Sequence, residues 1–191
     1  FLGCLKNAAN QFIQYKADTA VDIIAGYPWY QSISRQTFVA LPGLRIAQSE
    51  RKLAMEVLST YLPFLRNGLF PASIADPSLK HNSPDTSLWY IWALQQIRKQ
   101  GSRFREFGPP FYRAVKEIVS SYKSGNRVVS MMENGLLFAA EQGTALTWMD
   151  SYSHGQPIVP RYGKPVELNA LWYNAVCFAL EMARNEKDEE F

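Results

Sequence analysis

Cysteine and histidine are scarce in this 191-residue sequence, which contains two of each. Cys4 and Cys177 fall on predicted helices in apolar surroundings, so we expect buried free thiols and neither a disulfide framework nor a cysteine metal site. His81 and His154 stand far apart without a second ligand at metal spacing, which predicts loop histidines and no bound metal. A Gly-rich phosphate loop is also missing, so we expect no nucleotide cofactor.

Long apolar runs and an excess of charge of one sign are lacking too. No run approaches the roughly 18 apolar residues that span a bilayer, and the net charge of +3 comes from scattered cations. We therefore expect neither a membrane protein nor a nucleic-acid-binding protein. No signal peptide opens the sequence, although a chain that begins with Phe1 can have been cut from a longer one, and a cytoplasmic location is expected.

Hydrophobic and aromatic residues are abundant instead. The hydrophobic fraction of 47% and the charged fraction of 19% indicate an ordered globular protein, and residues 1–191 have the length of one domain. Aromatic residues reach 14%. Tryptophan and tyrosine favour ligand-lining positions, sugar stacking among them.

Two kinds of helical segment alternate along the chain. One apolar and one polar face at helical spacing predict amphipathic helices over residues 4–20, residues 49–67 and the stretch from Phe111 to Tyr122. Ser49 is the expected N-cap of the second helix, and Pro63 is expected to kink or split its last turns.

The other segments are apolar on nearly every side. They are residues 38–44, if these count as a short helix, the helix that begins at Asp85 and runs through Ile97, and residues 166–184. Between the helices, residues 128–138 predict a β-hairpin, because two apolar runs flank the pair Asn134-Gly135.

This alternation predicts concentric layers of helices. A helix that is apolar on all sides must be covered on all sides, whereas an amphipathic helix covers one neighbour and faces water. The pattern favours an all-α fold of the α/α-barrel type, with a plain helical bundle as the alternative. In such a barrel the loops gather on one face, where we expect these residues to converge: Trp29, Tyr30, Arg35, Asp85, Trp89, Trp148, Asp150, Arg161 and Lys164.

The stretch from Thr147 to Asn174 is the most informative. Residues 147–150 read Thr-Trp-Met-Asp, and residues 160–174 hold a Gly-Lys-Pro turn followed by an apolar helix. An acid between aromatics ahead of such a helix suggests a carboxyl group at the floor of a sugar site. The alternative is core aromatics with an ordinary surface carboxylate.

Five motifs, in this order along the chain, resemble the glucosidase region of glycogen debranching enzyme. They are residues 25–30 (AGYPWY), 35–43 (RQTFVALPG), 82–91 (NSPDTSLWYI), 146–150 (LTWMD) and 160–174 (PRYGKPVELNALWYN). The resemblance spans most of the sequence. It implies an (α/α)6 barrel related to glucoamylase and trehalase that hydrolyses α-1,6-linked glucose at branch points of glycogen with inversion, and an α-glucan or glycogen oligosaccharide as the partner.

The resemblance also assigns roles to individual residues. Asp150 becomes the general acid, and we expect Trp148, Met149 and Trp172 to surround it and raise its pKa by excluding water. The expected glucose-binding residues are Trp29, Tyr30, Arg35, Gln36, Asp85, Trp89, Trp148, Arg161, Lys164 and Glu167. Arg161 or Lys164 is also expected to hold a nearby carboxylate. Glu167 has an alternative role, because an acid in a first helical turn stabilises the helix dipole by about 0.3–1 kcal/mol.

The sequence departs from the family pattern in two ways. Gln36 stands where the family usually has an aspartate that binds glucose hydroxyls. An inverting glycosidase also needs a second carboxylate about 6.5–9.5 Å from the acid, and in these enzymes it comes from beyond the sixth helix, after which this sequence ends.

We therefore expect six helices forming about half of a barrel, with the general base supplied from elsewhere. The open sides of a half barrel would expose apolar surface, which predicts a homodimer or a missing C-terminal half. Two alternatives remain open: a non-catalytic glucan-binding or scaffold homologue, and a related glycosidase with another α-linked substrate.

Overall fold

Helices dominate the structure and pack around α4. The computed structural model describes residues 1–16, 19–27, 29–46, 50–76, 78, 80–101 and 103–191. The helices in chain order are α1 (Leu2–Asn10), α2 (Ser34–Leu41), α3 (Arg51–Tyr61), α4 (Pro84–Lys99), α5 (Phe104–Ser124) and α6 (Val166–Glu186). A π-helical turn, Pro42–Ile46, follows α2, and a 3-10 turn, Leu62–Phe64, follows α3.

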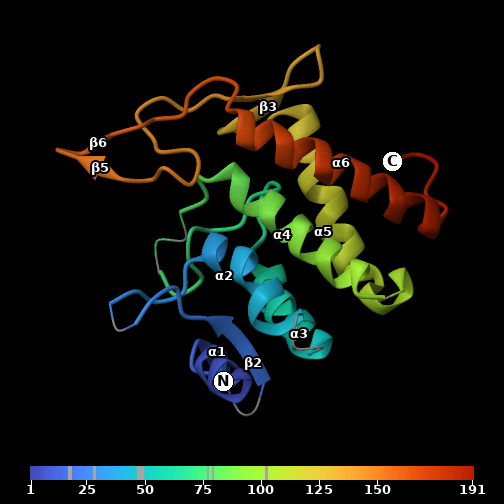
Figure 1. Cartoon of the computed structure of the whole chain (residues 1–191). Coiled ribbons are helices and arrows are strands. Elements are labelled where there is room, and N and C mark those ends of the chain that lie inside the picture. Colours follow the sequence, from blue (N-terminus) through green and yellow to red (C-terminus); the bar gives the residue numbers. More distant parts are fainter. Residues whose placement is uncertain (17–18, 28, 47–49, 77, 79, 102) are drawn as a thin grey trace.

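The strands are short and form separate antiparallel pairs. In the described part of the chain, β1 (Ile13–Lys16) pairs with β2 (Thr19–Ile23), β3 (Val129–Met131) with β4 (Leu137–Ala139), and β5 (Tyr152–Ser153) with β6 (Gln156–Pro157). The β3–β4 pair confirms the hairpin predicted around Asn134-Gly135. The β5–β6 pair protrudes on the left of Figure 1, beyond the helices.

The helices form two layers. Helix α4 lies between α2 and α6 (Figure 1), so the three segments predicted to be apolar on nearly all sides are neighbours in one row. Helix α3 covers β2 and α4, and α5 covers α4 and α6. The layering agrees with the alternation in the sequence, and it places the N-terminal ends of α2 and α4 beside each other.

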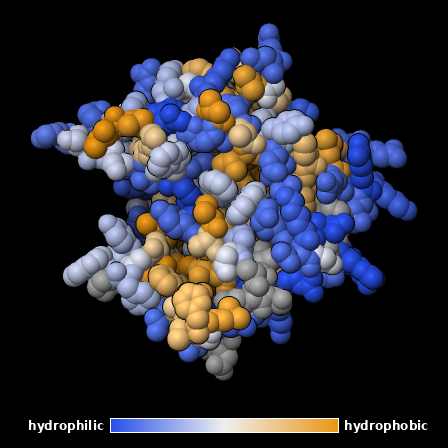
Figure 2. Space-filling view, in the orientation of Figure 1, coloured by the Kyte–Doolittle hydropathy of each residue, from blue (hydrophilic) through white to orange (hydrophobic). Residues whose placement is uncertain are grey.

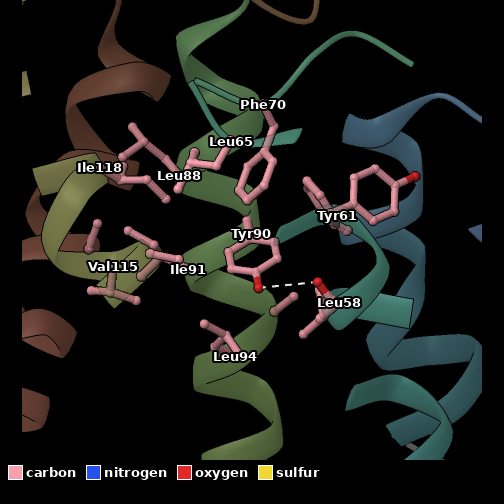
Figure 3. Packing of buried hydrophobic residues seen from close by; sticks show 14 of the residues in the cluster. Leu58, Tyr61, Leu65, Phe70, Leu88, Tyr90, Ile91, Leu94, Val115 and Ile118 are labelled. Atoms are coloured by element: carbon pink, nitrogen blue, oxygen red, sulfur yellow. Dashed lines mark hydrogen bonds between the residues drawn. The ribbon is translucent and has the colours of Figure 1, made fainter. Parts of the chain in front are cut away.

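Aromatic rings fill the core between α2, α3 and α4. Phe38 packs edge to face on Tyr61 and Tyr90, with ring centroids 4.7 and 5.1 Å apart. The Tyr90 hydroxyl donates a hydrogen bond to the carbonyl oxygen of Leu58 (Figure 3). All four residues are fully buried. The core therefore fixes the direction of α4, whose first turn carries one of the predicted site residues.

A buried carboxylate connects β2 to the helices. Asp22 Oδ1 accepts hydrogen bonds from the Ile23 amide (2.8 Å), the Thr37 hydroxyl (3.0 Å) and the Tyr61 hydroxyl (2.6 Å). Burial, together with the Asp22 charge, raises the pKa of Tyr61, which keeps its proton for this contact. These contacts join α2 and α3 to β2, and the sequence patterns did not predict them.

The prediction of one helix over residues 4–20 is wrong. Helix α1 ends at Asn10 and is followed by the β1–β2 pair, in which Ile13 faces Ile23 and both are buried. Phe12 and Tyr15 satisfied the helical spacing, but Ile13 is a β-branched residue, a type that favours strands, and its pairing with Ile23 prevails. The first amphipathic segment therefore does not become an outer helix.

The other predicted helices are present with shifted ends, and the largest shift is in α5, which begins at Phe104 and not at Phe111. The turn at Leu62–Phe64 places Pro63 where the second helix ends, and α4 and α6 begin at Pro84 and Val166, as expected within one residue. Ser49 and Pro28 lie outside the described residues. Cys177 is a half-buried free thiol, but Cys4 is exposed, contrary to prediction, because α1 buries none of its residues.

Some large apolar side chains are exposed on the helices. One group lies at α1, where Phe1, Leu2 and Leu5 are exposed. Figure 2 shows apolar surface at the bottom of the molecule, the place of α1 in Figure 1. Val166, Tyr173 and Leu180 are exposed at seven-residue spacing along α6, so they lie on one side of that helix. The expected homodimer remains a prediction, and this stripe on α6 is one candidate surface for it. None of the described helices has the length and apolar character of a membrane span.

The close approach of Gly68 to α5 yields a test of the packing. Gly68 has a φ of +74°, and a Cβ atom there would lie 2.6 Å from Ser121 Cβ; Gly143 has nearly the same φ of +73° but faces open space. Gly143→Ala should cost about 1–2 kcal/mol of unfolding free energy from backbone strain, and Gly68→Ala about 1–3 kcal/mol more from overpacking. Urea unfolding of both variants measures the difference. Equal losses would mean that the loop and α5 do not approach this closely.

Candidate active site

Arg35 links two of the predicted site acids. It is the second residue of α2 and is only 7% exposed. Its Nε and Nη2 atoms donate to the two carboxylate oxygens of Asp85 at 2.8 and 3.1 Å, and its Nη1 atom donates to Asp150 Oδ2 at 2.8 Å. The guanidinium group thus joins the first turns of α2 and α4 to the loop before β5.

The charges of this cluster depend on one another. Burial alone would lower the pKa of Arg35, but the carboxylates of Asp85 and Asp150 raise it above its ordinary value, so the guanidinium stays charged. Burial raises the pKa of Asp85, which is 1% exposed, and the bidentate pair with Arg35 opposes that rise. Since both Asp85 oxygens are used by Arg35, Asp85 orients the guanidinium.

Asp150 lies in a different environment from the one predicted. Its side chain is 52% exposed, and Trp148 beside it is 55% exposed, so no water-excluding aromatic cage surrounds the carboxylate. Trp172 is 5% exposed on another side of α6, where Nε1 donates to the Gly135 carbonyl at 3.1 Å and the ring stacks on Tyr122. The predicted cage was therefore wrong, and Asp150 is instead held by the charge of Arg35.

A cavity of about 600 Å³ lies between α4 and α6, a size typical of small-molecule sites. Its lining is rich in tryptophan and contains two acids: Asp85, Trp89, Trp92, Trp148, Glu167, Ala170, Leu171 and Asn174. The α4 residues 85, 89 and 92 and the α6 residues 167, 171 and 174 have the same spacing (i, i+4, i+7). This spacing places each set on one helical face, so two aligned stripes form opposite walls of the cavity.

Four of the lining residues were predicted from the sequence and four were missed. The structure brings together Asp85, Trp89, Trp148 and Glu167, as expected. The sequence reasoning missed Trp92, Ala170, Leu171 and Asn174. The helical spacing from Asp85 and from Glu167 contained the signal for Trp92, Leu171 and Asn174, since they follow on the same faces.

Glu167, which lines the cavity, is held by a second arginine. Arg161 Nε donates to Glu167 Oε1 at 2.9 Å, its Nη2 donates to Oε2, and the Thr147 hydroxyl donates to Oε1 at 3.4 Å. Burial would raise the pKa of Glu167, but these donors lower it below its ordinary value. Arg161 thus holds a carboxylate, as expected. Glu167 is also the acid in the first turn of α6, so its alternative role at the helix dipole fits the same position.

Four other predicted residues lie apart from this cavity. Trp29 and Tyr30 are 83% and 63% exposed in a turn closed by a backbone pair between Gly26 and Tyr30. Gln36 is exposed on α2, and Lys164 lines a separate hollow of about 260 Å³ beside Arg161 and Val166. Their side chains make no hydrogen bond, ion pair or ring contact with the cavity lining among the described residues.

The chemistry available at the site is that of carboxylates and neutral polar groups. In the described part of the chain, no group of three or more His, Cys, Asp or Glu side chains is arranged to hold a metal ion. His81 Nε2 instead lies 3.1 Å from the Phe64 carbonyl oxygen, and His154 contacts Ser153. Aromatic faces beside hydrogen-bonding acids suit a ligand with apolar faces and a rim of hydroxyl groups, as a pyranose ring has.

Comparison with known proteins now adds an independent finding. No curated protein gave a significant match to the chain. The family described as Amylo-alpha-1,6-glucosidase matches residues 7–191. The match covers nearly the whole chain and confirms the resemblance read from the five motifs. It relates the chain to the glycoside hydrolases of glycogen debranching: the chain belongs to the amylo-alpha-1,6-glucosidase family.

Proposed function

We propose that the chain is a glucosidase domain of the (α/α)6-barrel type, about half of a barrel, that binds terminal α-1,6-linked glucose of an α-glucan for hydrolysis with inversion. The observation that carries this proposal is the cavity between α4 and α6, in which three tryptophans stand beside the acids Asp85 and Glu167. Indole rings stack on the apolar faces of a pyranose, and carboxylates accept hydrogen bonds from its hydroxyl groups. The row of α2, α4 and α6 with α3 and α5 outside it supports the barrel type.

Asp150 is the proposed proton donor. Its half-exposed carboxylate shares the Arg35 guanidinium with Asp85, which lines the cavity, so Arg35 joins Asp150 to the cavity wall. When Asp150 delivers a proton to the departing glycosidic oxygen, it becomes a carboxylate, and the Arg35 charge stabilises that product state. Asp85 holds the Arg35 guanidinium in its orientation through two hydrogen bonds.

Glu167 is proposed to bind glucose hydroxyls. Its pairing with Arg161 keeps it ionised, and an ionised carboxylate accepts hydrogen bonds. Inversion also requires a base about 6.5–9.5 Å from the acid to activate water. We assign that role to no residue of this chain and propose that another segment or subunit supplies it.

A second candidate function is glucan binding without hydrolysis. It is favoured by the pairing of Asp150 with Arg35 and of Glu167 with Arg161, and by the neutral Gln36 beside Arg35. A binding module needs the tryptophans and the fixed carboxylates but not a water-activating base.

Calorimetric titration separates these functions. The chain is titrated with glucose and with a short branched glucan that ends in an α-1,6-linked glucose, and glucose release is measured on the same sample. Binding with release supports the glucosidase. Binding without release supports the glucan-binding module or a base supplied from outside the chain. Absence of binding to either ligand would contradict both functions.

Asp150→Asn tests the proton donor in a preparation that releases glucose. Turnover of the glucan should fall about 10²–10⁴-fold, since a poor leaving group needs general acid assistance, while sugar affinity stays within about threefold. Turnover of α-glucosyl fluoride, whose leaving group needs little protonation, should fall much less. Glu133→Gln, an exposed acid in the β3–β4 turn, is the matched control and should change neither rate. Unchanged glucan turnover in Asp150→Asn would remove Asp150 from this role.

Gln36→Asp tests the departure from the family pattern. Gln36 is the third residue of α2, whose first turn contains no acid, so the new carboxylate should stabilise the protein by about 0.3–1 kcal/mol through the helix dipole. It should also tighten glucose binding or raise turnover, while Gln36→Asn should do neither. Higher stability without any change in binding or turnover would indicate that the pocket does not use this position.

A further inference from the structure

Asn174 contains a buried hydrogen-bonding group that the protein does not use. It is the third member of the α6 stripe formed by Glu167, Leu171 and Asn174, and it lines the cavity. Its Nδ2 atom is buried and has no hydrogen-bond partner among the described residues. Buried polar groups are nearly always satisfied in native proteins, so such an exception needs an explanation.

Asn169 on the same helix provides the contrast. Its Nδ2 atom donates to the Leu137 and Pro165 carbonyls at 3.1 and 3.0 Å, and its Oδ1 atom accepts from the Leu137 amide at 2.7 Å. The side-chain amide of Asn169 therefore joins α6 to β4. Asn174 makes no comparable link, and its neighbours in the cavity lining, Trp92 and Leu171, are apolar. A leucine at position 174 would fill similar space without the cost of an idle amide.

The two α4 tryptophans define how a sugar ring can lie near this amide. Trp89 and Trp92 are in contact with ring centroids 5.2 Å apart and ring planes at 89°. Perpendicular rings form a corner, so a pyranose that stacks on one indole turns part of its rim towards the face of the other. The rim of such a ring is then directed to the facing wall of the cavity, where α6 contributes Leu171 and Asn174.

We propose that Asn174 hydrogen-bonds one hydroxyl group of the bound sugar ring and thereby selects the substrate. The proposal rests on the proposed glucose site. A hydroxyl group both donates and accepts, and the two ends of an asparagine amide are nearly equal in size and exchange by rotation about a soft χ2. Either amide orientation therefore satisfies the hydroxyl. The ligand class is an uncharged pyranose with a hydroxyl group at this position, and a sugar that is deoxygenated there should bind poorly.

Asn174→Leu, titrated with glucose and with the series of monodeoxyglucoses, tests the proposal. The unmodified chain should bind glucose about tenfold more tightly than one of the monodeoxyglucoses, as expected for one hydrogen bond to a partly buried amide. Asn174→Leu should bind glucose about tenfold more weakly and should no longer distinguish glucose from that analogue. Its thermal midpoint should be unchanged or higher, because the idle buried amide has been removed.

Asn185→Leu is the matched control. Asn185 is exposed near the end of α6, where its Nδ2 atom donates to Glu186 Oε1 at 3.2 Å. This variant should keep the affinity for glucose and the full discrimination among the analogues. If leucine at position 174 prevents folding, Asn174→Ala removes the amide without adding bulk and is measured in the same way.

The outcomes distinguish this proposal from the one on which it rests. If the unmodified chain binds glucose but the position-174 variants keep the discrimination, Asn174 does not contact the sugar and only this proposal fails. A lower thermal midpoint with equal weakening of every sugar would assign Asn174 a structural role and would also overturn it. If the unmodified chain binds no sugar, the proposed glucose site fails and this proposal fails with it.

Discussion

The buried charge of Arg35 is the constraint on which the site depends. A guanidinium that is 7% exposed must be paired, and it is shared between Asp85 and Asp150. Breaking a buried pair by removing one partner typically costs about 3–5 kcal/mol, so the first turns of α2 and α4 are not free to separate. The position of α4 in turn sets one wall of the cavity, and α6 sets the other.

The two ends of this cavity have different chemistry. Acids lie where α4 and α6 begin, at Asp85 and Glu167, and each acid is oriented by an arginine. One to two helical turns further along, the lining includes Leu171, Trp92 and the amide of Asn174. A ligand must therefore present hydroxyl groups to charged acceptors at one end and a neutral polar group at the other. This division suits an uncharged sugar better than an ionic ligand.

The sequence predicted the elements whose pattern is local. Helices α4 and α6 have long apolar periodicity, and the Asn134-Gly135 turn has a strong hairpin signal, so their positions followed from neighbouring residues. The segment after Asn10 was mistaken for helix because Phe12 and Tyr15, three residues apart, continue the helical spacing. The predicted cage around Asp150 was wrong because the direction of the Trp172 side chain was misjudged. Trp172 is five residues after Glu167, which places it on a different side of α6.

Long-range contacts could not be read from the sequence in the same way. The Arg35–Asp85 pair joins residues that are 50 positions apart, and the Arg35–Asp150 contact joins residues that are 115 apart. No periodicity encodes such a separation, and the motif resemblance named these residues without specifying their contacts. The aligned stripes on α4 and α6 are an intermediate case, since each stripe was readable but their pairing required the packing of the two helices.

The loop that carries Asp150 has one further consequence, for protein engineering. Its ends are tied together by two backbone hydrogen bonds between Ala139 and Gly163, and inside it the Ala145 amide donates to the Tyr152 hydroxyl at 2.8 Å. Beyond these ties, the β5–β6 turn at His154-Gly155 protrudes into solvent (Figure 1). Each doubling of a flexible loop costs only about 0.6 kcal/mol. The turn is therefore a suitable point for inserting a fluorescent reporter or an affinity tag. The ends of the loop are already joined by hydrogen bonds, so an added segment should transmit little strain to the Arg35 cluster.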